Sequence, residues 1–214
     1  MTLRAVEDAL APHALTILGG LHPDRDELPG PVGTVLLIGP DEPRFWPHIR
    51  AQSEFADRAP DPLDRWSRRV LEQAAGLLGA RAVFPFGGPP WHPFVDWALR
   101  SGHAWHSPAT LLVHDRLGLF LSYRGALLID ERLDLPPAGR RPCDDCAAQP
   151  CRTACPVGAL TPDGYDLGNC HEYLDRAAGA GCMSRGCAVR RACPVGAWRR
   201  ATAQSAFHMR AFHP

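Results

Sequence analysis

The stretch Cys143-Asp-Asp-Cys146-Ala-Ala-Gln-Pro-Cys151-Arg-Thr-Ala-Cys155-Pro156 begins the part of the chain that decides the fold. It supplies four thiols within a few turns of backbone, and the segment after it supplies four more. The later thiols are those of Cys170, Cys182, Cys187 and Cys193. These eight cysteines are all that the 214-residue sequence contains. Thiols gathered in this way predict a shared chemical role for the segment.

A nine-residue segment occurs twice within this region. The first copy is Arg152-Thr-Ala-Cys155-Pro156-Val157-Gly158-Ala159-Leu160, and the second is Arg190-Arg-Ala-Cys193-Pro194-Val195-Gly196-Ala197-Trp198. In each copy, the proline after the cysteine fixes φ and removes an N–H group, which helps the chain to turn away. The glycine that follows would allow close packing. The repeat indicates duplicated chemistry.

Two sets of four thiols are what two [4Fe-4S] clusters require. Four thiolates around a small cube are most easily supplied by a run of closely spaced cysteines and one distant cysteine. The short runs and the two Cys-Pro steps supply both kinds of ligand.

The spacing resembles that of the bacterial dicluster ferredoxins. Their usual run is C-x2-C-x2-C-x3-C-P, whereas this chain has C-x2-C-x4-C-x3-C-P and then C-x4-C-x5-C-P. In that family the cysteine before proline ligates the other cluster. The resemblance therefore implies crossed sets: Cys143, Cys146, Cys151 and Cys193 for one cluster, and Cys170, Cys182, Cys187 and Cys155 for the other. The wider gaps leave open the corners taken by Cys182 and Cys187, and whether both clusters are [4Fe-4S].

Two other roles for the thiols are less favoured by the sequence. Tetrathiolate zinc sites would also use eight cysteines, but they usually repeat C-x2-C pairs, and only Cys143 and Cys146 form such a pair. A disulfide framework is not expected, because no secretory segment is evident and disulfides are rare in the cytosol.

Composition narrows the remaining classes of function. The 23 basic and 23 acidic residues balance, so no basic field indicates nucleic acid. The apolar runs Thr34–Ile38 and Ala126–Ile129 are far shorter than the ~20 residues of a membrane helix. We therefore expect a soluble, cytoplasmic protein. The segment 143–214 is too short for a generous core, so bound clusters would supply much of its stability.

The rest of the chain predicts a mixed front domain of sheet and helices, hence an α+β fold. Three closely spaced strands near its end imply antiparallel pairing among themselves. Expected helices cover Thr2–Leu18, Pro43–Phe55, Pro62–Leu78 and Pro93–Arg100, and expected strands cover Thr34–Ile38, Ala82–Phe86, Thr110–His114, Leu117–Tyr123 and Gly125–Asp130. The Pro-rich stretch Leu133–Arg141 predicts a linker. The expected domains are 1–134, which would bind a cofactor or acceptor, and 135–214, a small ferredoxin-like domain with two [4Fe-4S] clusters.

The order of these parts resembles the epoxyqueuosine reductase family and, more distantly, the reductive dehalogenases. The stretch from Ser101 to His114 looks like the reductase signature A-G-x-G-W-x-G-K-N-T-x-L-I-H, without its lysine and asparagine. Phe84–Pro90 and Ser122–Ala126 are similar to segments of cobalamin-processing proteins. These resemblances imply a flavin-reductase-like front fold and a corrinoid acceptor. The candidate cofactor-binding residues are Gly87, Gly88, Trp105, Tyr123 and Arg124.

One departure limits what the resemblance implies. Gly88 stands where the reductases have the aspartate proposed as proton donor, so queuosine chemistry is not carried over and no catalytic residue is assigned. The sequence predicts an iron–sulfur redox protein that takes electrons from a donor protein and passes them to an acceptor in its front domain. Two alternatives stay open: a plain ferredoxin-type carrier whose front domain docks partner proteins, and a zinc-binding structural module.

Overall fold

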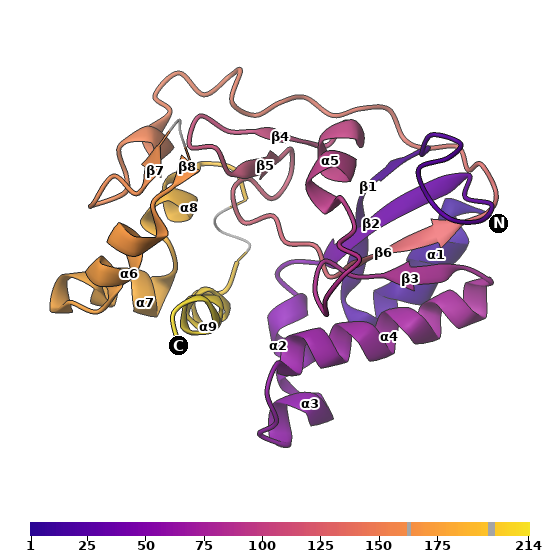
Figure 1. Ribbon diagram of the computed structural model, residues 1–214, viewed down its shortest axis with the longest axis horizontal. Coiled ribbons are helices and arrows are strands. Elements are labelled where there is room, and N and C mark those ends of the chain that lie inside the picture. The colour runs from indigo at the N-terminus through magenta and orange to yellow at the C-terminus, as the bar shows by residue number, and fades with distance from the viewer. Residues whose placement is uncertain (162–163, 197–199) are drawn as a thin grey trace. The chain divides into compact units, whose positions relative to one another are not determined.

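The structure, a computed structural model, describes residues 1–161, 164–196 and 200–214 and has a mixed α+β fold (Figure 1). It divides into two compact units. The front unit comprises Met1–His103 and Ser122–Gly139, and the cysteine unit comprises Ala104–Leu121 and Arg140–Pro214. The expected boundary after residue 134 differs from this division, because Ala104–Leu121 packs with the cysteines rather than with the front sheet.

A four-stranded antiparallel sheet forms the centre of the front unit. Its strands lie in the order β1 (Leu15–Leu21), β2 (Thr34–Pro40), β6 (Gly125–Ile129) and β3 (Arg81–Val83). All residues of β2 and β6 are buried. Strands with neighbours on both sides favour such continuous apolar runs when both faces are covered. The strands expected from Thr34 and from Gly125 are confirmed, whereas the one expected over Ala82–Phe86 is shorter.

Helices α1 (Leu3–Leu10), α4 (Pro62–Leu78) and α5 (Phe94–Arg100) pack around this sheet, and Figure 1 shows the long α4 running along it. The apolar stripe of α4 is buried, and its Trp66 is fully enclosed. Pro62 occupies the first helical turn, where its missing N–H costs nothing. The expected helices over 62–78 and 93–100 are therefore confirmed.

The N-terminal helix ends earlier than expected. Thr2 caps it by accepting the Ala5 N–H at 3.2 Å, but the α-helix stops at Leu10. A 3-10 turn over Ala11–His13 follows, and Ala14 has a left-handed φ of 52° that cannot continue a helix. The stretch expected to be helical up to Leu18 instead begins β1. Its β-branched residues suit a strand, and pairing with β2 satisfies its backbone.

The helix expected over Pro43–Phe55 is divided in two. Helix α2 spans Phe45–Arg50 and helix α3 spans Ser53–Ala56. Gln52 between them is extended, with φ −84° and ψ 154°, so the helical hydrogen bonds cannot run through.

The three strands expected after residue 110 do not pair with one another. Strand β5 (Leu112–His114) pairs with β4 (Ala104–His106), whereas β6 joins the front sheet. No strand forms over Leu117–Tyr123, apart from a single bridge between His114 and Gly118. The guanidinium groups of Arg190 and Arg200 donate to the carbonyls of Leu119 and Phe120, so these carbonyls have partners outside a ladder.

The cysteine unit consists of short elements separated by turns. Besides β4 and β5, they are η2 (Pro150–Arg152), β7 (Leu160–Thr161), β8 (Gly164–Tyr165), α6 (Leu167–Leu174), η3 (Ala177–Gly179), α7 (Ala180–Arg185), α8 (Ala188–Ala192) and α9 (Thr202–Phe212). The expected linker Leu133–Arg141 has no helix or strand. In the second repeat copy, Ala197 and Trp198 lie outside the described residues. None of the described helices has the length and apolar character needed to cross a membrane.

A half-buried ion pair joins α3 to α4 in the front unit. The carboxylate of Glu54, which is buried, accepts from Arg69 Nε at 2.5 Å and from Arg69 Nη2 at 3.1 Å. These hydrogen bonds hold the pKa of Glu54 below its usual range, although burial alone would raise it. The pair therefore stabilises the fold when Glu54 is ionised.

Replacing Glu54 with glutamine is expected to lower the free energy of unfolding by about 1.5 kcal/mol. This is the low end of the range for a hydrogen bond to a charged group, because the Arg69 side chain is half exposed. Because the pKa of Glu54 is lower in the folded state, its stabilisation is complete above the ordinary carboxyl pKa. It is lost as the pH falls through the folded pKa. Urea titrations should show that the difference in unfolding free energy between the wild-type protein and Glu54→Gln is smaller at acid pH than at neutral pH. Asp8→Asn, which breaks the exposed Arg4–Asp8 pair, is the control and should cost less than about 1 kcal/mol.

Candidate metal centre

Four thiols from distant parts of the cysteine unit line one cavity. They are those of Cys143, Cys146, Cys151 and Cys193. The empty space within the cavity is about 350 Å³, open solvent included. The first three cysteines belong to one short run, and the fourth comes from the second repeat copy. Their grouping is that of the first crossed set.

The local backbone places each of these thiols. Cys143 and Cys146 share a turn in which the Cys146 N–H donates to the Cys143 carbonyl at 3.3 Å. Cys151 is the central residue of η2, and Cys193 follows the last residue of α8. Short turns of this kind let thiols from several elements point to one place.

An apolar wall lines one side of the cavity. It consists of three side chains that are each only 1% exposed and pack with Cys151 and Cys193. They are Val113 on β5, Leu119 after β5 and Val189 on α8. Burial raises the pKa of the Cys151 thiol, as does the neighbouring Cys193. Such a wall would keep water from a centre bound between the thiols.

Two glycines allow the backbone around Leu117 and Gly118, which follows β5, to lie close to the second repeat copy. A Cβ on Gly118 would lie 2.0 Å from the Val195 carbonyl oxygen and 2.9 Å from Cys193 Sγ. A Cβ on Gly196 would lie 2.5 Å from the carbonyl carbon of Leu117. Gly158, the counterpart in the first copy, has nothing within 4 Å, and its φ of 62° alone favours glycine. The expected close packing is thus found at Gly196 and not at Gly158.

The second set of thiols lies around α6 and α7. Cys170 is on α6, Cys182 is on α7, Cys187 precedes α8, and Cys155 follows η2. Burial raises the pKa of Cys170, and the nearby thiols of Cys187, Cys155 and Cys182 raise it further. Cys155 is therefore an electrostatic neighbour of the later cysteines.

The electrostatic neighbours of the first set follow the same crossed grouping. Burial raises the pKa of the Cys143 thiol, and among the cysteines it is Cys151, Cys193 and Cys146 that raise it further. Cys187 packs at the edge of both apolar clusters, one built around Cys151 and Cys193 and the other around Cys182. The two sets are thus adjacent within one unit.

Two sulfurs of the second set accept hydrogen bonds from other residues. The Tyr165 hydroxyl donates to Cys170 Sγ at 3.2 Å, and the Ala159 N–H donates to Cys155 Sγ at 3.3 Å. Donors of this kind offset part of the negative charge on a sulfur.

All eight cysteines are free thiols. Within the described part of the chain, no three His, Cys, Asp or Glu side chains are grouped so as to hold one metal ion. Side chains that bind a single ion must lie close together, because thiolate ligands lie about 2.3 Å from a shared zinc. A cubane differs, because its four thiolates are spread over the corners of the cluster.

The predicted cofactor residues lie in two different units. Trp105 packs against the cysteine cluster of Cys151 and Cys193, whereas the others belong to the front unit. Gly87 and Gly88 have φ values of 93° and 99°, as the expected turn requires. The structure therefore does not bring Trp105 and the glycines together within one compact unit.

Tyr123 and Arg124 have contacts within the front unit. The ring of Tyr123 lies 6.3 Å from that of Phe94. Arg124 donates to Asp64 at 3.1 Å, and its guanidinium lies 5.8 Å from the centre of the Phe86 ring. These contacts give Arg124 a structural role.

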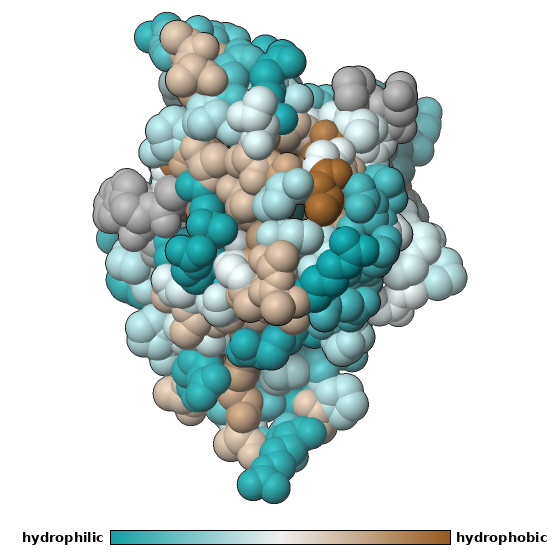
Figure 2. Space-filling model, turned by 90° about the vertical axis from the view of Figure 1, so that its left-hand side faces the viewer, coloured by the Kyte–Doolittle hydropathy of each residue, from teal (hydrophilic) through white to brown (hydrophobic). Residues whose placement is uncertain are grey.

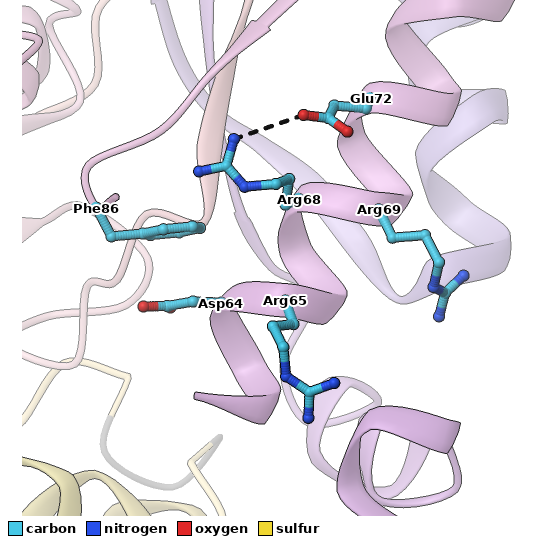
Figure 3. Close-up of a pocket in the computed structure, with 6 residues that line it drawn as sticks. All are labelled: Asp64, Arg65, Arg68, Arg69, Glu72 and Phe86. Atoms are coloured by element: carbon cyan, nitrogen blue, oxygen red, sulfur yellow. Dashed lines mark ion pairs between the residues drawn. The ribbon is translucent and has the colours of Figure 1, made fainter. Parts of the chain in front are cut away.

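A polar hollow lies beside α4 in the front unit (Figure 3). Its empty space is about 720 Å³, open solvent included, and it is lined by Asp64, Arg65, Arg68, Arg69, Glu72 and Phe86. Figure 3 shows Asp64 and Arg68 extending toward the Phe86 ring, while Arg65 and Arg69 point away. Arg68 pairs with Glu72 at 3.5 Å and lies 4.6 Å from the centre of the Phe84 ring.

Sequence reasoning missed Tyr165, the apolar wall beside the first set and the hollow. Only Tyr165 has a local signal, since it lies five residues before Cys170. The wall depends on packing between residues distant in sequence. Comparison with models of known protein families gives no match for the chain, and comparison with curated proteins gives none either.

Proposed function

We propose that the chain is an iron–sulfur redox protein with two [4Fe-4S] clusters in its cysteine unit. The observation that carries the proposal is the convergence of Cys193 with Cys143, Cys146 and Cys151 on one cavity. A cysteine from the second repeat copy joins the first run there. This crossing is the arrangement of dicluster ferredoxins, so we also propose a ferredoxin-like fold for this unit and a flavin-reductase-like fold for the front unit.

The residues around the thiols suit this role. Sets of four free thiols match the ligand number of a cubane, and the first set has an apolar wall on one side. The second set has hydrogen-bond donors at two of its sulfurs. When bound, each cluster would supply one-electron redox chemistry. The chain would hold the clusters close together and tune them through burial and hydrogen bonds.

A reductive titration tests this function. With one electron per cubane, the anaerobic protein should take up about two electrons per chain, and its broad visible absorption should bleach as it does so. Zinc-substituted protein is the matched control, because zinc has no redox chemistry. An iron-loaded protein that accepts no electrons would contradict the proposal.

The electron acceptor is proposed to meet the front unit, and a donor protein is proposed to reduce the clusters. The resemblance implies a corrinoid, which needs a largely apolar cleft. The hollow beside α4 holds the charged side chains of Asp64, Arg68 and Glu72 beside a single aromatic ring, so it does not offer the large apolar cleft that a corrinoid needs. We therefore derive no step through that cofactor. A titration with cob(II)alamin separates the alternatives. A saturable spectral change would favour a corrinoid-binding front unit, and no change would favour a carrier that docks partner proteins.

A further inference from the structure

The hydroxyl of Tyr165 contacts a proposed cluster ligand. Tyr165 lies on β8, where its backbone pairs with Leu160 of β7. Its O–H donates to Cys170 Sγ at 3.2 Å. A hydrogen bond to a ligand sulfur draws negative charge from it and so favours the reduced cluster, whose charge is more negative.

The C-terminal end of the chain holds this tyrosine in position. Phe212, the last residue of α9, stacks on the Tyr165 ring at 6.1 Å with the ring planes 6° apart. The next residue, His213, contacts the Asp175 carboxylate at 2.9 Å. The Tyr165 side chain is thus packed from one side although the residue is 40% exposed. Figure 2 shows that the face carrying α6 and α7, on the left in Figure 1, mixes apolar and hydrophilic residues.

The first set has a different environment. Its thiols lie against the apolar wall. Asp144 and Asp145 lie between two of its proposed ligands, but each pairs with an arginine, and their side chains are 61% and 71% exposed. Their charge is therefore offset and screened at this set. The wall keeps the potential of this set low, because an apolar environment disfavours the more negative, reduced cluster.

We propose that Tyr165 makes the centre on Cys155, Cys170, Cys182 and Cys187 the higher-potential one, so that electrons collect there. This inference rests on the proposed iron–sulfur function. With both clusters bound, an electron from the donor protein would pass from the first centre to the second, and the acceptor would take it from there. The transfer would involve no proton and no leaving group.

The test is an anaerobic potentiometric titration of iron-loaded Tyr165→Phe, followed by electron paramagnetic resonance. The variant keeps the ring that stacks on Phe212 and removes only the hydroxyl. One hydrogen bond changes an equilibrium constant by up to about tenfold. For a one-electron couple this lowers the potential of the second centre by up to about 59 mV. The first centre should not shift. Cys146→Ser, which removes a ligand of the first set alone, identifies the signal of the second centre.

Tyr173→Phe is the matched control. Its hydroxyl donates to the Ala178 carbonyl at 2.7 Å, so its loss removes a tyrosine hydrogen bond without touching a sulfur. Neither potential should move in this variant. If Tyr165→Phe does not retain the second cluster, Phe212→Leu provides the test instead. Loss of the ring that stacks on Tyr165 should weaken the hydrogen bond to Cys170 and lower the potential of the second centre.

The outcomes separate the two proposals. Equal potentials in the wild-type protein, or an unmoved potential in a fully iron-loaded Tyr165→Phe, would overturn the role of Tyr165 and leave the iron–sulfur function standing. Wild-type protein without iron and sulfide would overturn the proposed function itself.

Discussion

Cys193→Ser is expected to remove the cluster of the first run while leaving the cluster of the second. The iron content should fall from about eight to about four atoms per chain, with an equal loss of sulfide. Alkylation of the native protein, followed by peptide mass mapping, should then label Cys143, Cys146 and Cys151. The reason is spatial, because Cys193 lines their cavity although it follows the later cysteines in sequence.

Cys155→Ser is the reciprocal variant. It should expose Cys170, Cys182 and Cys187 to alkylation and leave the first set protected, because Cys155 is an electrostatic neighbour of Cys170. If each serine variant instead unprotected the other thiols of its own short run, the crossed grouping would be wrong.

Gly196→Ala is expected to cost the first set its cluster, whereas Gly158→Ala should leave both clusters in place. The two positions correspond in the repeat and have similar φ values, 70° and 62°. A left-handed φ costs an L residue roughly 1–2 kcal/mol in either place. At Gly196, however, the new Cβ would also lie 2.5 Å from the backbone of Leu117, which must move. At Gly158 the new Cβ meets open space.

Iron analysis and urea unfolding of the two iron-loaded variants measure this difference. Gly158→Ala should keep about eight irons and lose about 1–2 kcal/mol of stability. Gly196→Ala should lose about half its iron and more stability than its counterpart. Equal behaviour of the two alanine variants would show that the approach of Leu117 to Gly196 does not hold Cys193 in place.

The repeated cysteine pattern could be seen in the sequence because it is short and local. The crossed sets came from the resemblance of that pattern to dicluster ferredoxins, and they place Cys193 with the first run, whose cavity it lines. The long helix α4 was accessible for a similar reason, since its start signal and its apolar stripe are both local.

Pairing between distant segments could not be predicted from the sequence. The run Leu117–Tyr123 has the composition of a strand, but Leu119 packs on the cysteine cluster and its carbonyl accepts from Arg190. Likewise, the N-terminal segment resembles one long helix until Pro12 and the left-handed Ala14 end it. In both places a tertiary partner or a single backbone conformation overrides the local pattern.

The site residues divide along the same lines. The cysteines carry their chemistry in their identity, so the proposed ligands could be named from the sequence. Tyr165 could not, because a tyrosine acts on a sulfur only when the β7–β8 hairpin and Phe212 place its hydroxyl there. Arg68 and Phe86 were missed for the same reason, since the hollow exists only once α4 lies beside the turn that follows β3.

Anaerobic purification followed by iron, sulfide and zinc analysis tests the central claim most directly. Two cubanes predict about eight iron and eight sulfide per chain, with little zinc. Zinc bound without acid-labile sulfide would contradict this account and would make the cysteine unit a structural zinc module.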